Sequence, residues 1–146
     1  MIRIAVIDGQ GGGIGTTIIK KIVEVHGNRV EIWALGTNAI ATAQMMKAHA
    51  NRGATGENAI RHCVQQVDVL IGPISILLAH SMMGEVTPGM VQAIGSAQAT
   101  KILLPVTQDP IVIVGTVREP LPHLVEKLVS HHLTELIARK EPEPCP

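Results

Sequence analysis

Phenylalanine and tyrosine are absent from this 146-residue chain, and Trp33 is its only aromatic residue. The core must therefore be built from aliphatic residues and methionine. The same absence excludes two kinds of chemistry. The chain has no series of aromatic side chains on which nucleic-acid bases could stack, and no tyrosine is present to act as a general acid or base.

An excess of charge of either sign is also missing. Twelve basic and twelve acidic residues give a formal net charge of zero and a pI near 7.1. Nucleic acids and anionic membranes usually attract proteins with a field of one sign, so we expect neither as a partner. Cys63 and Cys145 lie far apart and no secretory leader pattern is present, which argues against disulfides and export. We therefore expect a cytoplasmic protein.

No apolar run is long enough to span a membrane. The longest, residues 69–79, contains Gly72 and Pro73 and is typical of a buried strand that enters a helix. With 46% hydrophobic residues, the chain can bury a substantial core. We predict one domain over residues 1–140 and a flexible tail over residues 141–146.

Apolar segments alternate with helical patterns along the chain. Parallel strands that are buried on both faces have continuous apolar sequences. This pattern predicts five strands, at residues 2–7, 30–35, 67–72, 101–106 and 111–115. Helices are predicted over residues 16–25 and 120–139. The fold class that follows is α/β, a three-layer Rossmann-like doubly wound sheet of about five mostly parallel strands.

The predicted strand order is 2-1-3-4-5. The fifth strand is free to run antiparallel, because only Asp109 and Pro110 separate it from the preceding segment. Two loops, residues 53–58 and 84–89, are expected at the rim formed by the carboxyl ends of the strands. Thr55 and Thr87 are the candidate helix N-caps there, with Pro88 at a first helical position.

Five glycines crowd into residues 9–15, directly after the first predicted strand. Glycine permits a tight turn and lets a ligand approach bare backbone, and the amides at the start of the next helix prefer an anion. We therefore predict a phosphate site. The pattern G-x-x-x-G-I-G from Gly9 to Gly15 resembles the cofactor loop of short-chain dehydrogenases, with Asp8 in place of their usual threonine. Their catalytic tyrosine is missing, so hydride chemistry is not expected.

Asp8 would repel a phosphate unless its carboxylate is otherwise engaged. Three roles are open: a hydrogen bond to a ligand hydroxyl, coordination of a metal, or acceptance of the loop's own amides.

After the second strand, Thr37 and Asn38 form a neutral rim without the charged residue that distinguishes NAD from NADP, and both are also N-cap types. The predicted cofactor-binding residues are Asp8, Gly9, Gln10, Gly11, Gly12, Gly13, Ile14, Gly15, Gly36, Thr37, Asn38, Gly72, Pro73 and Ile74.

The remaining polar residues do not form a recognisable catalytic group, so no catalytic residue is assigned. His80, Ser81 and Glu85 are a possible acid-base cluster, but the first two are too close in sequence to share a helical face, so we predict no catalytic triad. Glu57 begins a helical turn, where it either favours the helix dipole or contacts a ligand. The histidines and Cys63 lack the spacing of zinc ligands, so no metal is predicted.

A resemblance covers nearly the whole chain. The strings IAVIDGQGGGIG, ALGTNAIATAQM, GATGENAI, IGPI, HSMMGEVTPGM, AIGS and EPLPHL occur in this order. Together they resemble a family of small bacterial proteins, domain of unknown function family 3842. The resemblance implies a Rossmann-like fold and a bacterial source. The family has no established activity that could be transferred.

Three interpretations of function follow. The first is a binding or regulatory module that holds a phosphate-bearing nucleotide or dinucleotide in the glycine loop. The second is a small enzyme acting on a phosphorylated or nucleotide substrate, with a site shared across an oligomer interface. The third is a scaffold whose glycines are merely structural. Six methionines and the high apolar fraction favour a homodimer or larger homo-oligomer, with residues 79–90 as the predicted contact surface.

Overall fold

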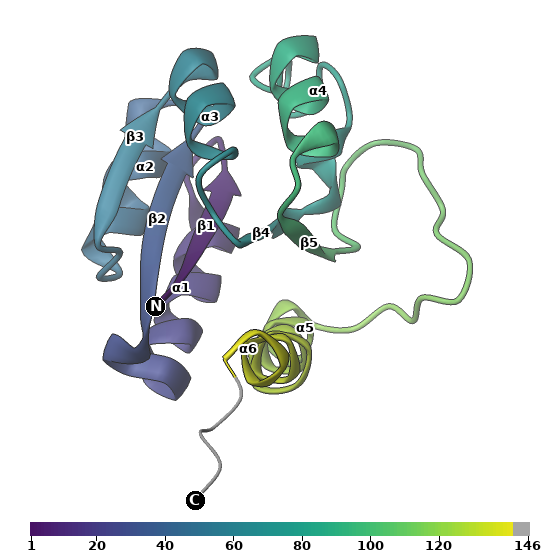
Figure 1. Cartoon of the computed structure of the whole chain (residues 1–146). Helices are drawn as coiled ribbons and strands as arrows, with labels where there is room; N and C mark the ends of the chain where they lie inside the picture. The colour runs from purple at the N-terminus through teal and green to yellow at the C-terminus, as the bar shows by residue number, and fades with distance from the viewer. Residues whose placement is uncertain (142–146) are drawn as a thin grey trace, which may run out of the picture.

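The computed structural model describes residues 1–141 and is organised around the short apolar segments of the sequence (Figure 1). The elements, in chain order, are β1 (Ile2–Asp8), α1 (Gly13–His26), η1 (Gly27–Arg29), β2 (Val30–Gly36), α2 (Ala39–Lys47), β3 (Arg52–Thr55), α3 (Glu57–Cys63), β4 (Val69–Pro73), η2 (Ile74–Leu77), α4 (Pro88–Ser96), β5 (Thr100–Leu104), α5 (Leu121–Glu126), η3 (Lys127–Leu133) and α6 (Thr134–Lys140).

The five strands form one sheet in the order β3-β2-β1-β4-β5, and every neighbouring pair is parallel. In the centre of the sheet, Ile4 of β1 pairs with Ile32 of β2 and with Val69 of β4. Because all strands point the same way, their carboxyl ends meet at one rim, which is the upper edge of the sheet in Figure 1. The predicted class, a three-layer Rossmann-like α/β fold, is confirmed.

Alternate residues of β1 serve two separate cores. Ile4 and Val6 pack against α1, α2 and the C-terminal helix, whereas Ala5 and Ile7 face α3 and α4 on the other side of the sheet. This is the period of two that a strand imposes on its side chains. The absence of phenylalanine and tyrosine is compensated by isoleucine, which fills most of the fully buried positions, and by Met45.

Two strand predictions are corrected by the structure. Residues 111–115 form no strand, because the chain turns away from the sheet after Pro105 and no neighbouring strand is within reach of this apolar segment. The fifth strand is instead β3, whose residues are mostly exposed and therefore give no apolar signal. The strand order predicted for the other four strands is correct, and the option of an antiparallel strand is excluded.

The helix caps follow the sequence signals in part. The Thr87 hydroxyl accepts a hydrogen bond from the Met90 amide, with Pro88 in the first turn of α4, as predicted. Asn38 caps α2 by accepting from the Ala41 amide at 2.9 Å. Thr55 is not a cap: it ends β3, and Gly56 takes the N-cap position of α3.

The predicted closing helix is present as α5, the π-helical segment η3 and α6, which follow one another without a break. Of the predicted tail, Glu141 forms an ion pair with the amino terminus at 3.3 Å, and residues 142–146 lie outside the described part of the chain. Across residues 1–141, no helix has both the length and the apolar character needed to cross a membrane.

His26 joins the first helix to the last. It is 6% exposed, and its Nε2 atom lies 3.1 Å from the Thr134 hydroxyl. Burial, the largest effect, lowers the pKa of the His26 ring, and the positive charge of Arg29 lowers it further. The folded state therefore binds a proton at this ring less readily than the unfolded chain does.

We predict that the free energy of unfolding decreases as the pH falls from 7.5 through the unfolded-state pKa of histidine, about 6.5, toward the lower pKa of the folded state. Denaturant titrations at a series of pH values measure this, with His26→Gln expected to flatten the profile. The exposed His123, changed in the same way, is the control. An equal pH dependence in wild type and His26→Gln would contradict the prediction.

Candidate functional site

The glycine loop is fastened by the side chain of Asp8, at the end of β1. Asp8 is 3% exposed, and its two oxygens accept from the Gly9 and Gly15 amides, each at 2.8 Å. Burial, the largest effect, raises the pKa of the Asp8 carboxyl; the amides of Gly15, Gly9 and Ile14 oppose this, and the Glu85 charge adds to it. Of the three roles open to Asp8, the structure shows acceptance of its own loop's amides.

Three glycines of the loop are required by their surroundings. Gly12 has φ +74°, a left-handed conformation, and the Ala41 carbonyl oxygen would lie 2.9 Å from an added Cβ. A Cβ at Gly9 or at Gly15 would collide with neighbouring side chains. These three residues are explained by packing and backbone geometry without any ligand.

Gly11 and Gly13 are not explained in this way. A Cβ at either position would meet nothing within 4 Å, and neither residue has a left-handed φ. Their amides donate to no other group within the described residues 1–141. Two positions on either side of Gly12 therefore present bare backbone and free donors to open space.

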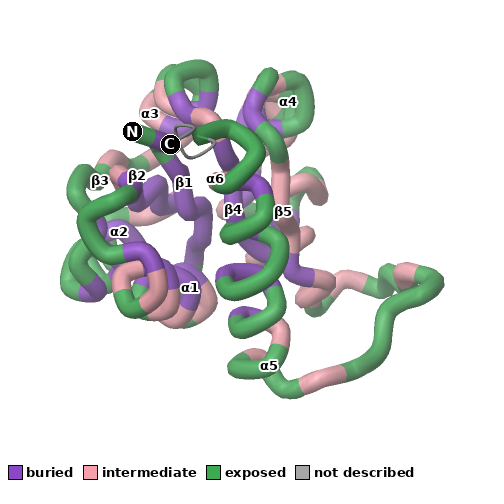
Figure 2. Tube along the Cα trace, turned by 60° about the horizontal axis from the view of Figure 1, so that its bottom comes forward, coloured by how far each residue is buried: buried purple, intermediate pink, exposed green. Residues whose placement is uncertain are grey.

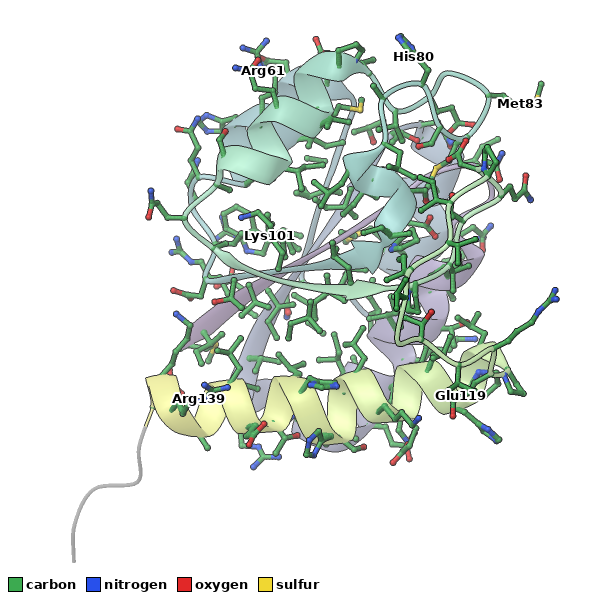
Figure 3. All side chains as sticks on the ribbon, turned by 90° about the vertical axis from the view of Figure 1, so that its right-hand side faces the viewer. Arg61, His80, Met83, Lys101, Glu119 and Arg139 are labelled. Carbon is green, nitrogen blue, oxygen red and sulfur yellow. The ribbon has the colours of Figure 1, made fainter. Side chains whose placement is uncertain are left out.

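That space is a cavity of about 570 Å³ above the glycine loop. One wall is the segment that follows β4 and η2, and the other is the start of the loop that follows β5. Figure 3 shows His80 and Met83 of the first wall at the upper edge of the molecule. The lining residues are Asp8, Gly9, Gln10, Gly11, Gly12, Gly13, Ile14, Ser75, His80, Met82, Met83, Val106, Thr107, Gln108 and Asp109.

The predicted site residues are distributed unevenly around this cavity. Residues 8–14 line it, whereas Gly15, residues 36–38 and residues 72–74 do not. Gly36 and Gly72 have packing roles, since a Cβ would collide with Thr42 at the first and with the Ile7 carbonyl oxygen at the second. The open part of the rim thus lies toward β4 and β5, away from β2.

Several residues of the cavity wall were not predicted from the sequence. They are Ser75, Met82, Met83, Val106, Thr107, Gln108 and Asp109. A signal for the last three was present, because they follow β5 as the glycine loop follows β1, and the carboxyl ends of parallel strands share one rim. Met82 and Met83 were expected near the rim in an oligomer contact and not in a ligand cavity, because the turn that brings them to its wall has no sequence pattern of its own.

The β2 side of the rim is covered by Glu85. One oxygen, Oε1, accepts three hydrogen bonds: from the Gln10 amide at 2.8 Å, the Thr37 hydroxyl at 2.7 Å and the Asn38 side-chain amide at 2.8 Å. Burial alone would raise the pKa of the Glu85 carboxyl, but the three donors together lower it. The residues expected to contact a ligand after β2 therefore bind a carboxylate of the protein itself.

The segment that carries Glu85 has an unusual backbone. His80, Met82 and Met83 have φ of 66°, 55° and 57°, and Gly84 has 93°. Left-handed φ is unfavourable for residues with a side chain. The possible acid-base cluster does not assemble, because Ser81 is buried and donates to the Ser75 carbonyl while Glu85 faces β2.

Glu57 has a structural partner. Its carboxylate accepts a hydrogen bond from the Thr87 hydroxyl and so links α3 to the cap of α4. Glu57 does not line the cavity. Among the residues that the structure describes, no three His, Cys, Asp or Glu side chains come together as metal ligands.

Measurements of stability test the difference between Gly12, which its surroundings require to be glycine, and Gly11, which they do not. We predict that Gly12→Ala lowers the free energy of unfolding by about 2 kcal/mol, because the added Cβ meets the Ala41 backbone in a left-handed conformation. Gly11→Ala should change it by less than about 0.5 kcal/mol or stabilise slightly. Chemical denaturation of the two variants measures this, and equal losses would contradict it.

The strand order, the glycine loop and a cavity above the carboxyl ends of the strands define a Rossmann-like α/β protein with a ligand-sized rim cavity. The chain belongs to the family described as Domain of unknown function (DUF3842), whose sequence pattern matches residues 3–137. The resemblance seen in the sequence is thereby confirmed.

Other comparisons add little about chemistry. No curated protein matches the chain. The fold is similar to that of a dodecameric FMN-dependent Ubix-like decarboxylase from Escherichia coli O157:H7, with 15% sequence identity, 93% of this chain and 94% of that chain covered, and a TM-score of 0.42. A likeness at this level transfers neither ligand nor reaction to this chain.

Proposed function

We propose that this protein binds a phosphate-bearing nucleotide or cofactor, with the phosphate against the amides of Gly11 and Gly13, and that it acts as a binding or regulatory module. One observation carries the proposal. Both positions are glycine although neither packing nor backbone conformation requires it. A residue without a side chain is needed there if another molecule comes close to the backbone.

The start of α1 supplies favourable electrostatics for an anion. The helix begins at Gly13 and runs for 14 residues, so its first-turn amides point toward the loop and its dipole favours negative charge. Asp8 takes the amides of Gly9 and Gly15 and leaves those of Gly11 and Gly13 for a ligand.

The cavity favours a mononucleotide-sized ligand over a dinucleotide. A volume of about 570 Å³ is within the usual range of small-molecule sites. Val106 offers an apolar contact for a ring system, and Thr107 and Gln108 offer hydrogen bonds for hydroxyl groups. A dinucleotide would have to extend over Thr37, where Glu85 covers the rim.

A small enzyme that acts on a phosphorylated or nucleotide substrate is the second candidate. The observation that favours it is that His80 and Asp109 both line the cavity, where each could exchange protons with a bound molecule. Turnover of the bound compound, lost in His80→Gln and Asp109→Asn but with binding retained, would select this function.

The binding site is tested with a matched pair of glycine variants. Purified protein is denatured and released small molecules are identified by mass spectrometry. Affinity is then measured by calorimetry for inorganic phosphate, AMP, flavin mononucleotide and any compound released. We predict that Gly13→Val weakens binding at least tenfold, because its side chain occupies the space above the amides.

The control is Gly95→Val in α4, where a Cβ would make only an ordinary contact, 3.9 Å from Leu77. It should bind as the wild type does, and both variants should unfold at similar denaturant concentrations. Equal affinity of Gly13→Val and wild type for every bound compound would contradict the assignment of the phosphate site.

We also propose that the chain forms a homo-oligomer, with the loop between β5 and α5 as its contact surface. Val112, Val114 and Val117 are 91%, 95% and 73% exposed, and Figure 2 shows this loop as an exposed arm that extends from the body. Clustered apolar exposure of this kind favours association. At residues 79–90, where the sequence predicted the contact, no helical stripe forms, because Val86 and Met90 are buried and residues 79–86 form turns, although Met83 is 99% exposed.

We predict that the double variant Val112→Asp, Val114→Asp is monomeric at concentrations where the wild type is associated, because two charges replace apolar contact area. Light scattering across a dilution series measures the mass. Ile40→Asp is the control, since Ile40 is an exposed apolar residue on α2. A wild-type mass that stays near 15.5 kDa at high concentration would contradict the assembly.

A further inference from the structure

We propose that Glu85 is an internal anion that holds residues 80–87, here called the lid, closed over the rim, and that this carboxylate and the phosphate of a bound ligand exclude each other. The inference rests on the proposed function, because it concerns the same glycine loop. It adds to that function a residue that sets affinity and a segment that must move.

The contacts of Glu85 resemble those of a bound anion. Its Oε1 atom gathers donors from two loops, the Gln10 amide after β1 and the side chains of Thr37 and Asn38 after β2. Three donors that converge on one oxygen form a site for negative charge. The carboxylate of the lid fills this site in the structure.

The glycine loop is shaped to accept the closed lid. A Cβ at Gly9 would lie 2.3 Å from the Thr37 hydroxyl oxygen, 2.6 Å from the Met82 sulfur and 2.9 Å from Glu85 Oε1. Gly9 therefore leaves room for two side chains of the lid. This explains a loop glycine that faces the lid, as the open positions at Gly11 and Gly13 are explained by a ligand.

Like charges make the two occupants competitors. The Gln10 amide that binds Glu85 is adjacent in the chain to Gly11, so a phosphate at Gly11 and Gly13 would lie beside the Glu85 carboxylate. The cavity itself is lined by the carboxylates of Asp8 and Asp109, and none of its described lining residues is lysine or arginine. No lysine or arginine side chain of the lining balances the charge of an added phosphate, so that charge acts against Glu85.

The base of the lid is firmly held, whereas its tip has an unfavourable backbone conformation. Its base is fixed, because the His80 amide donates to the Val86 carbonyl at 2.7 Å and the Ser81 hydroxyl donates to the Ser75 carbonyl at 2.5 Å. Its tip holds Met82 and Met83 in left-handed conformations that are unfavourable for residues with side chains. Backbone hydrogen bonds within the turn and the bonds of Glu85 together oppose this strain. Loss of the Glu85 bonds removes the part that ties the tip to the neighbouring loops, while the base stays in place.

The experiment separates the charge of Glu85 from its bonds. Affinity for inorganic phosphate is measured by calorimetry in wild type, E85Q, E85A and E57Q. E85Q keeps an acceptor oxygen and removes the charge. E57Q removes a carboxylate that accepts from Thr87 at the base of the lid but has no bond to the glycine loop. We predict at least tenfold tighter binding in E85Q and E85A, and wild-type affinity in E57Q.

Hydrogen exchange of the wild type provides a readout that is independent of affinity. Saturating phosphate should slow exchange at residues 11–15 and accelerate it at residues 82–86, because the ligand displaces the lid. E85A without phosphate should show the same acceleration at residues 82–86. Protection of both segments by phosphate would overturn the proposal, as would weaker phosphate binding in E85Q.

Different results would refute the phosphate site and the competition between phosphate and Glu85. If all four proteins bind phosphate equally, the competition is refuted and the glycine-loop site stands. If none binds phosphate or any nucleotide, the proposed function is refuted and the competition with it. Tighter binding in E85Q together with faster exchange of the lid supports both.

Discussion

The structure of the rim depends on the hydrogen bonds between the Asp8 carboxylate and the amides of Gly9 and Gly15. They join the end of β1 to the first turn of α1 and so fix the loop between them, whose intervening amides then face outward. Burial of the carboxylate is unfavourable, as the raised pKa of Asp8 reflects, and the two amides offset part of this cost. A neutral side chain would close the loop with less charge in the cavity, so the charge itself shapes what this site can bind.

The rim above this loop is divided into two unequal parts. On the β2 side, Glu85 occupies the donors of Thr37 and Asn38; on the β4 and β5 side, the cavity is open. The open part contains carboxylates and, among its described lining residues, no lysine or arginine. Backbone amides alone bind a phosphate with modest strength, so under the proposed function a ligand needs further contacts with the apolar wall at Val106. Under that function, a ligand with a large ring system would satisfy this requirement better than a simple phosphate ester.

The sequence correctly predicted the elements that depend on neighbouring residues in the chain, such as helix caps and turns, and the strands that are buried on both faces. The apolar runs of β1, β2, β4 and β5, the cap at Thr87 and the glycine loop are of this kind. The strand β3 was missed because an edge strand needs a neighbour more than it needs apolar residues. Residues 111–115 have the composition of a strand and lack that neighbour. Glu85 was recognised as polar, but its bonds span 75 residues to Gln10 and 48 to Thr37, a separation that no local pattern encodes.

The exposed arm and the ligand cavity share residues, which links the two proposals about this protein. Val106 and Thr107 line the cavity above the glycine loop and also a second one, of about 600 Å³, between the arm and α5. Contact of a second copy with the arm would therefore act on the wall that faces the ligand. Linkage requires the effect to be reciprocal: if assembly increases affinity for the ligand, the ligand promotes assembly by the same factor. Under these two proposals, a wall held by a neighbouring copy would enclose the bound ligand on the side of the arm.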